Sequence, residues 1–228
     1  MSEQSSAPSR VGRHVVVLCH PDPQSFNRSV ADAYCKEVRA NGQEIIFRDL
    51  YAMGFDPVLK ASERPTIPGF KRSADVEQEI ATIGGSDVFV LVYPIWFGSA
   101  PAMMKGYVER VLGTGVDPQA LQARLASDLL GGKRLLSFTA SAAKTLWLDE
   151  QGQESALRDV FDRYLVAGFG MHSQKHIHLG HITDQLTEHF AAQDFYEVEE
   201  QARRTCAEVA SALHRTAHDR AEALHHTA

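Results

Sequence analysis

Short apolar runs alternate with segments of helical periodicity along most of this chain of 228 residues. Five runs have the length and composition of buried strands: 13–20, 43–49, 87–93, 133–139 and 174–181. Helical patterns cover 26–41, 75–84, 100–112, 153–167 and 190–225. Because strands that are separated by helices pair in parallel, this alternation predicts an α/β fold with helices on both faces of one sheet.

Five parallel strands fit the flavodoxin-like three-layer sandwich, in which the strands lie in the order 2-1-3-4-5. We expect one such domain over residues 13–215, a flexible tail over 1–12 and a polar tail over 216–228. Sheets of this kind bind ligands in a crevice outside the carboxyl ends of the strands, near strands one and three. The segments that follow the first, third and fourth strands are therefore the candidate binding loops.

Composition argues against several classes of protein. The formal net charge is −6 and there is no basic block, which argues against nucleic acid as a partner. No segment reaches the ~18 apolar residues of a membrane span, and the first residues lack the apolar core of a signal peptide, so we expect a cytoplasmic protein. Cys19, Cys35 and Cys206 are odd in number and lack CxxC spacing, so we expect neither a disulfide framework nor a metal site.

The loop after the first strand carries the most informative motif, HPDPQSFN at residues 20–27. It leads directly into a helix, whose first N–H groups have no partner within the helix and whose dipole favours negative charge. Ser25 either caps this helix or turns its hydroxyl to a ligand phosphate. The loop therefore indicates a phosphate-bearing cofactor.

The loop after the third strand reads YPIWFGSAP at residues 93–101 and holds two large aromatic side chains between prolines. Trp96 and Phe97 favour a partner surface, and a planar ring system is a natural one because aromatic faces stack well. Gly98 lets the backbone approach a ligand closely. The alternative is that the two aromatic side chains only pack beneath a helix.

Three segments together resemble the NAD(P)H:quinone oxidoreductases of DT-diaphorase type, a group of flavoenzymes with the flavodoxin fold. They are HPDPQSFN (20–27), RDLYAMGFDPVL (48–59) and YPIWFGSAPAMMKGYVERVL (93–112). The likeness covers roughly residues 13–113 in sequence and extends in topology to about 182. The three motifs stand in the order and in the strand–loop–helix context that the family shows.

The resemblance implies which residues bind the flavin. The segment that would bind its phosphate groups contains His20, Ser25, Phe26 and Asn27. The loop that would hold its ring, with backbone N–H groups toward N1, O2 and N5, contains Pro94, Ile95, Trp96, Phe97 and Gly98. Thr139 matches the family's loop after the fourth strand. FAD is the first expectation for the cofactor and FMN a close second, with NAD(P)H as the co-substrate.

Two departures from the family pattern affect the site. The ring loop is one residue shorter than is common, and TASAA at residues 139–143 stands where the family has a Thr-Thr-Gly-Gly turn. The Tyr and His that are proposed to relay charge in the family have no clear match, so the catalytic residues stay unassigned. Trp147 falls near the Tyr position, where it either walls the substrate pocket or belongs to the core.

Several other residues have ordinary structural interpretations. His172, His176, His178 and His181 cluster on the fifth strand, where we expect surface or edge histidines rather than metal ligands. Leu50, Met53 and Phe55 are expected to bury against the fold or against a second subunit. The apolar side chains of the helix at 100–112 that we expect to form spare surface are Met103, Met104 and Tyr107.

We therefore expect a flavin-dependent NAD(P)H oxidoreductase that passes a hydride through flavin N5 to a quinone or similar acceptor, in a ping-pong cycle that moves two electrons. The resemblance also implies a homodimer with its active site near the subunit boundary. One alternative is a flavin- and NAD(P)H-binding regulatory subunit, of the kind that is ancillary to potassium-efflux channels, with little turnover. The other is an unrelated receiver-like α/β module.

Overall fold

One parallel sheet organises the computed structural model, which describes residues 10–123 and 125–225. Its strands are β1 (Arg13–Leu18), β2 (Glu44–Asp49), β3 (Val88–Pro94), β4 (Arg134–Ala140) and β5 (Ser173–Leu179). They pair in parallel in the order β2-β1-β3-β4-β5, so the predicted flavodoxin-like sheet is confirmed. Most of the tail expected over residues 1–12 lies outside the described residues.

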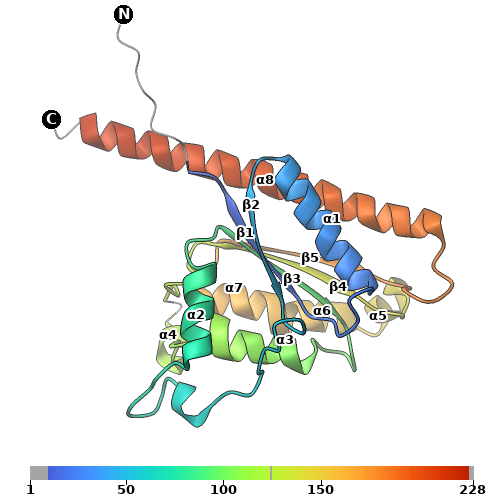
Figure 1. Ribbon diagram of the computed structural model, residues 1–228, viewed down its shortest axis with the longest axis horizontal. Coiled ribbons are helices and arrows are strands. Elements are labelled where there is room, and N and C mark those ends of the chain that lie inside the picture. The colour runs from blue at the N-terminus through green and yellow to red at the C-terminus, as the bar shows by residue number, and fades with distance from the viewer. Residues whose placement is uncertain (1–9, 124, 226–228) are drawn as a thin grey trace, which may run out of the picture.

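Helices cover both faces of this sheet (Figure 1). The face that carries the two longest helices holds α1 (Phe26–Ala40) and α8 (Glu188–His225). The opposite face holds α2 (Ala74–Ile83), α3 (Ala102–Tyr107), η2 (Val108–Leu112), α6 (Gln153–Leu157), η3 (Arg158–Arg163) and α7 (Tyr164–Phe169). The shorter elements are η1 (Ala61–Glu63), α4 (Pro118–Gln122) and α5 (Thr145–Glu150).

Two of the expected helices differ in detail from the structure. The segments η2 and η3 are π-helical turns that interrupt the helices expected over 100–112 and 153–167. Helix α8 continues to His225, as the helical pattern over 190–225 predicted, and its end includes the segment that we expected to be polar. Residues 216–219 and 222 of this end are exposed.

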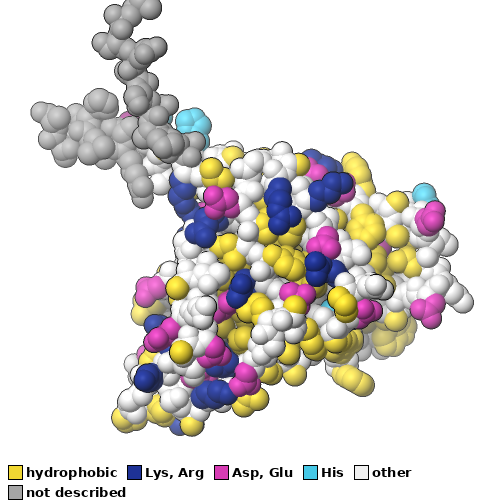
Figure 2. Space-filling view, viewed as in Figure 1, with side chains coloured by type: hydrophobic (Ala, Val, Ile, Leu, Met, Phe, Trp, Pro, Cys, Tyr) yellow, Lys and Arg dark blue, Asp and Glu magenta, His cyan; other side chains and the backbone are white. Residues whose placement is uncertain are grey.

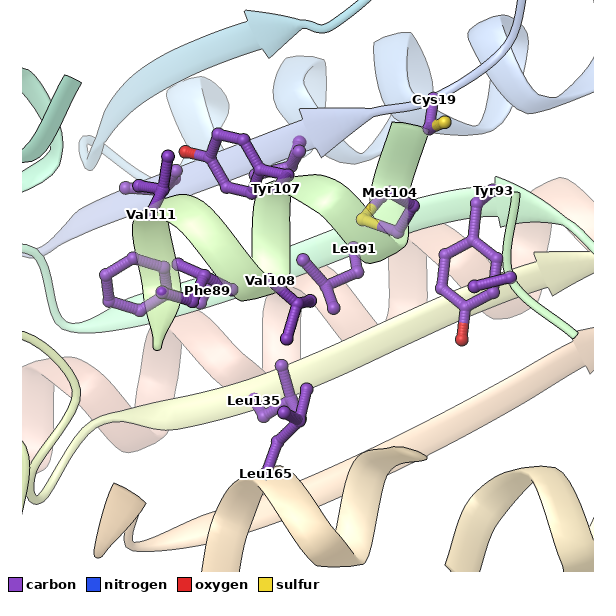
Figure 3. Packing of buried hydrophobic residues seen from close by; sticks show 14 of the residues in the cluster. Cys19, Phe89, Leu91, Tyr93, Met104, Tyr107, Val108, Val111, Leu135 and Leu165 are labelled. Atoms are coloured by element: carbon purple, nitrogen blue, oxygen red, sulfur yellow. The ribbon is translucent and has the colours of Figure 1, made fainter. Parts of the chain in front are cut away.

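Each face of the sheet buries its own apolar core, because side chains alternate between the two faces along a strand. Val15 and Val17 of β1 point toward the α3 side, whereas Val16 and Leu18 point toward α1 and α8. Burial on both faces explains why the strands read as continuous apolar runs. On the α3 side, β3 side chains lie by α3 and η2, and Leu135 of β4 lies against Leu165 of α7, as the close view of the core shows (Figure 3).

The prediction of spare apolar surface on the helix at 100–112 was wrong for two of its three residues. Met104 and Tyr107 are fully buried, and only Met103 is partly exposed. The helix packs closely here because Gly106 lies against Pro57, where an added Cβ would come within 2.5 Å of the proline. Leu50 and Phe55 are buried as expected, whereas Met53 is 39% exposed in the single chain.

The surface of the described residues is mixed in charge. Figure 2 shows basic and acidic side chains interspersed over the side of the molecule on which both α1 and α2 are visible in Figure 1. The three cysteines lie inside as free thiols, and burial raises the pKa of Cys19 to about 12. No helix within the described ranges combines the length and the apolar composition that a membrane crossing requires.

Candidate functional site

A cleft opens at the carboxyl edge of the sheet, where β1, β3 and β4 end. Its volume is about 380 Å³. It is lined by His20, Asp22, Ser25, Phe26, Asn27, Pro94, Ile95, Trp96, Ala140, Ser141, Ala142 and Ile182. Seven of the ten residues that the sequence singled out for cofactor binding therefore meet in one place, at the switch point where ligands bind in folds of this class.

The first wall of the cleft is the start of α1. Ser25 is the N-cap, and its hydroxyl oxygen accepts a hydrogen bond from the backbone N–H of Arg28 at 3.2 Å. The hydroxyl proton stays available to a ligand, so capping and anion binding are compatible here. Asn27 is buried and lines the same wall. The helix dipole adds positive potential at this end of the cleft.

His20 completes this wall. Its Nδ1 lies 3.1 Å from the backbone N–H of Asp22, from which it can accept, and 3.3 Å from the carbonyl oxygen of the same residue, to which it can donate. In the tautomer that accepts, Nε2 carries the ring proton and is a donor that suits a phosphate oxygen. Asp22 also accepts the N–H of Gln24 at 2.8 Å, so its carboxylate fixes the loop while contributing negative charge to the cleft.

The second wall is a tight turn after β3. Trp96 and Ser99 exchange two backbone hydrogen bonds of 3.0 and 3.1 Å, and the two residues between them, Phe97 and Gly98, both have positive φ. A φ of 51° is uncommon for a phenylalanine, and the turn directs its side chain fully into solvent. Trp96 faces the cleft instead, with its ring 5.8 Å from that of His20.

The two aromatic residues of this turn therefore have different surroundings. The alternative that they pack beneath a helix does not hold, since Trp96 is 39% exposed and Phe97 is fully exposed. Phe97 and Gly98 do not line the cleft among the residues described. The backbone N–H groups of Ile95 and Trp96 donate to Ala140 and Ser99 within the protein. Backbone N–H donors to a bound ring would then come from Phe97 and Gly98, at the tip of the turn.

The third wall, after β4, is held without the glycines of the related family. Ser141 donates its N–H to Leu179 and accepts the N–H of Ile182 on its carbonyl, at 3.1 and 2.9 Å. His181 donates its N–H to the carbonyl of Ala143. The loop after β4 is thus tied to the loop after β5, and Ala140, Ser141 and Ala142 face the cleft. Trp147 is half-exposed, which is inconsistent with a core position, and it is not among the lining residues.

Thr139 does not line the cleft, because its side chain is buried beneath it. Its hydroxyl is 2.8 Å from Nε2 of His176 and 2.9 Å from Nδ1 of His178. Both histidines lie on β5, which is an edge strand of the sheet, as expected. The prediction of an ordinary surface position is wrong for His176, whose side chain is almost completely buried and whose Nδ1 pairs with the buried carboxylate of Asp162. Within the described ranges no group of three or more His, Cys, Asp or Glu is arranged to hold a metal ion.

Sequence reasoning missed Asp162, Ser141 and Ile182. Asp162 lies on η3 and reaches His176 only through the tertiary fold, so spacing along the chain carries no signal for it. Ser141 stood in the segment that was noted only for its missing glycines. A polar residue at every second position of a buried strand, Ser137 and Thr139, was the available signal for a polar site beneath the cleft.

Comparison with known proteins agrees with this architecture. A family model described as "Flavodoxin-like fold" matches residues 12–206, which is most of the chain. This chain belongs to the flavodoxin-like fold family. A solved structure of similar fold, NAD(P)H:quinone oxidoreductase from Methanothermobacter marburgensis, superposes with a TM-score of 0.72 at 21% identity, over 86% of this chain and 96% of that one. An FMN-dependent NADH-azoreductase from Bacillus anthracis, solved with FMN, gives 0.65 at 16% identity, over 86% and 100%.

Curated relatives are similar over shorter stretches. A protein of Haemophilus influenzae named "Uncharacterized NAD(P)H oxidoreductase" is 37% identical over 103 residues, which is 45% of this chain and 51% of that protein. NAD(P)H dehydrogenase [quinone] 1 of Rattus norvegicus is 27% identical over 154 residues, which is 60% and 56%. The chain thus spans about half the length of the curated relatives it matches. These names confirm the resemblance to NAD(P)H:quinone oxidoreductases that the sequence motifs indicated.

Proposed function

We propose that this protein is a flavin-dependent NAD(P)H oxidoreductase that reduces a quinone or a similar acceptor. The observation that carries the proposal is the cleft itself. It unites a helix N-terminus with hydrogen-bond donors at one wall and an exposed tryptophan face at the other. These are the two requirements of a ligand with a charged phosphate part and a flat aromatic part. The names of the relatives support the same reaction class.

The residues of the cleft fit a flavin by their chemistry. His20, Ser25 and Asn27 would donate hydrogen bonds to its phosphate groups, next to the positive end of the α1 dipole. Trp96 would lie against the ring, and the backbone of the turn at Phe97 and Gly98 would supply N–H donors. Thr139 would support the site from beneath the cleft, because its hydroxyl is already hydrogen-bonded to His176 and His178.

When bound, the flavin would accept a hydride from NAD(P)H at N5 and pass two electrons to the acceptor in a ping-pong cycle. The chain itself then needs no nucleophile. Its residues bind and orient the reactants, and they exclude water from the face of the cleft that Trp96, Phe26 and Ile182 cover. FAD remains our first proposal and FMN the second; the FMN-dependent neighbour supports a flavin without choosing between them.

We also propose that the protein acts as a homodimer. An apolar groove of about 560 Å³ lies between the η2 and η3 helices, shares no lining residue with the cleft, and includes Val108, Val160 and Tyr164 in its wall. Val160 is 75% exposed and Tyr164 is 56% exposed, which is costly for two neighbouring apolar side chains in a single chain. The resemblance to dimeric flavoenzymes favours a second copy as the cover. The free thiols agree with a cytoplasmic, reducing compartment.

The visible spectrum of the purified protein, followed by mass identification of any released cofactor, tests the flavin. Consumption of NAD(P)H with menadione as the acceptor tests the reaction. Rapid consumption by flavin-loaded protein supports the proposal. Loaded protein that consumes almost none favours the regulatory subunit that the sequence left as an alternative. Protein that takes up neither FAD nor FMN contradicts both and favours an unrelated α/β module.

A further inference from the structure

A row of polar side chains crosses the otherwise apolar α3 side of the sheet and ends at the cleft. Strand register places Ser137 beside His176 and Thr139 beside His178, with all four on one face of β4 and β5. Asp162 comes from η3, which packs over this face. We call this set the polar row; it consists of Ser137, Thr139, Ser141, Asp162, His176 and His178.

The inner end of the polar row is a buried ion-pair site. Asp162 is fully buried, and one of its carboxylate oxygens accepts the hydroxyl of Ser137 at 2.7 Å. The other accepts a hydrogen bond from Nδ1–H of His176, whose side chain is 1% exposed. Tyr93 also faces this site, and burial together with the charge of Asp162 raises the pKa of its phenol. It therefore stays protonated and does not compete for a proton.

From this inner end the hydrogen bonds continue without a break to the cleft. Nε2 of His176 is 2.8 Å from the hydroxyl of Thr139, which is 2.9 Å from Nδ1 of His178. Nε2 of His178 is 3.0 Å from the hydroxyl of Ser141. Ser141 lines the cleft, and in this structure its hydroxyl also reaches the carbonyl of Ala143 at 3.3 Å.

This row has two self-consistent directions, because every member between its ends can both donate and accept. In one direction each hydroxyl and ring N–H from Ser141 to Thr139 donates toward the buried Asp162 end of the row, and His176 is neutral beside the Asp162 carboxylate. In the other all donors point toward the cleft, and His176 carries both ring protons. The second state holds one proton more than the first, next to a buried negative charge that stabilises it.

We propose that the polar row is a proton relay, and that Ser141 hands its proton to the oxygen of the acceptor during reduction. The inference rests on the proposed function, in which NAD(P)H and a quinone-type acceptor react. That reaction consumes a proton: quinone, NAD(P)H and H⁺ become hydroquinone and NAD(P)⁺. NAD(P)H is oxidised by loss of a hydride, the quinone is reduced, and the relay supplies the H⁺.

Ser141, His178 and Thr139 each give one proton and receive one, and His176 gives one. The Ser141 hydroxyl proton passes to the acceptor oxygen, and Nε2–H of His178 replaces it. The Thr139 proton passes to Nδ1 of His178, and Nε2–H of His176 replaces that proton. The net change is the loss of one proton from His176, which stays bonded to Asp162 through Nδ1. Solvent recharges the row through Ser141 when the cleft is open. Ser141 is the catalytic residue of this scheme, and the others position and convey the proton.

The first test uses protein without flavin and follows the ring nitrogens of the two histidines by nitrogen-15 NMR as the pH changes. Coupled groups titrate as a pair rather than singly. We expect His176 and His178 to shift together in the wild type and separately in Thr139→Val, which removes the bridging hydroxyl at nearly constant volume. Thr205→Val, a buried change on α8, is the matched control and should leave the coupling intact. Separate titration in the wild type overturns the relay.

The second test uses flavin-loaded enzyme and measures the two halves of the cycle by stopped flow. Ser141→Ala and Thr139→Val should slow reduction of the quinone by about 100-fold, the usual contribution of a positioned acid. Oxidation of NAD(P)H needs no proton from the relay, so it should slow by much less than reduction of the quinone in the same variants. Added imidazole should restore part of the rate in Ser141→Ala, because a small acid can enter at the cleft end.

The outcomes separate the two proposals. Slowing of both halves alike, or of neither, contradicts the relay while the proposed function stands. Protein that binds no flavin contradicts the proposed function, and the NMR result then decides the relay alone. If Thr139→Val does not fold, Ser141→Ala at the partly exposed cleft end carries the kinetic test, since it leaves the buried pair untouched.

Discussion

Trp96 is the side chain on which the proposed cofactor site depends most. It lines the cleft, it is 39% exposed, and its ring lies 5.8 Å from that of His20. An aromatic face that is held at a cleft but only partly covered is available to a second ring. Its neighbour Phe97 points fully away in the single chain. Of the two aromatic side chains that we expected to stack on the flavin ring, only Trp96 is therefore placed to do so.

Trp96→Ala should weaken flavin binding by about tenfold, since aromatic stacking contributes about 1 kcal/mol beyond the area it buries. The measurement is a titration of flavin-free protein followed by quenching of flavin fluorescence. Trp147→Ala is the matched control, because it removes a half-exposed tryptophan that does not line the cleft. Equal affinities for wild type and Trp96→Ala would show that the turn does not stack on the ring.

Ser25→Ala should weaken flavin binding less than Trp96→Ala does. The reason is that other donors at the same wall, His20 and Asn27, remain. It should also lower the free energy of unfolding by about 1 kcal/mol, because the hydroxyl caps α1 through the N–H of Arg28. Denaturant unfolding measures the second effect. A larger loss of flavin affinity than in Trp96→Ala would reverse the order assigned to the two walls.

The place of a single residue in the site could be predicted from the sequence when it follows from the order of the strands. It could not be predicted when it depends on the geometry of a turn or on packing between distant segments. Residues 20–27 and 94–96 were predictable as one site because the ends of adjacent parallel strands meet. The outward direction of Phe97 was not, since it follows from the handedness of a turn with two positive φ values. The pairing of Asp162 with His176 was not either, because it depends on how η3 packs over β5.

One side chain of η2, Arg110, attaches this element to the irregular segment before α2. Arg110 of η2 is buried and donates two hydrogen bonds of 2.9 and 2.7 Å to the carboxylate of Glu63, which η1 carries. It also pairs with Asp75 at the start of α2 and with the carbonyl of Asp56. This one guanidinium therefore joins three segments that share no strand or helix.

The ion pair makes stability depend on pH in acid. Hydrogen bonds from Arg110 lower the pKa of Glu63 to about 2 from its ordinary value of 4.5. Because the folded pKa lies below the unfolded one, the stabilisation is complete above pH 4.5 and is lost as the pH falls toward 2. Arg110→Met should flatten this dependence and lower the free energy of unfolding at neutral pH by about 3 kcal/mol.

Denaturant unfolding between pH 2 and 7 checks this prediction. Arg163→Met is the matched control, because Arg163 is 62% exposed and pairs with Asp159 on the surface of η3. Surface pairs of this kind contribute less than about 1 kcal/mol. Equal losses in the two variants would show that the buried pair contributes no more than a surface pair.

The sequence predicted the presence of the strands and the longer helices better than it predicted the hydrogen-bond pattern within the helices. All five strands follow from apolar runs, and α1 ends at Asn41 and Gly42 as their residue types indicated. The π-helical turns η2 and η3 were not predictable, because a shift from i+4 to i+5 bonding leaves no mark in composition. The short helices α4 and α5 carry too few residues for a periodic pattern.

The molecule as a whole presents two surfaces, the candidate cofactor cleft and the apolar groove. The cleft is at the carboxyl edge of the sheet, whereas the apolar groove beside Val160 lies between the helices of the α3 side. A homodimer built on this groove would leave the anion-favouring wall of the cleft open to its ligand. It would also bring partner residues toward the same side as the polar row, since η3 supplies both Val160 and Asp162.

Val160→Asp should convert the proposed dimer into a monomer, because a carboxylate buried in an apolar contact loses its hydration. Sedimentation of the wild type should give twice the chain mass of 25.2 kDa, and the variant should give that mass once. Val58→Asp is the control, since Val58 is also exposed but does not line the groove. A wild type that sediments as a monomer at micromolar concentration contradicts the dimer.

The most direct test of the proposed flavin site is an anaerobic titration of the flavin-loaded protein, followed by its visible absorption. We expect the flavin-free chain to take up FAD or FMN, and added NAD(P)H then to bleach the flavin band. A quinone should restore the band in full. Protein that binds no flavin, or that keeps its flavin oxidised in excess NAD(P)H, would show that this cleft does not hold a flavin for two-electron transfer.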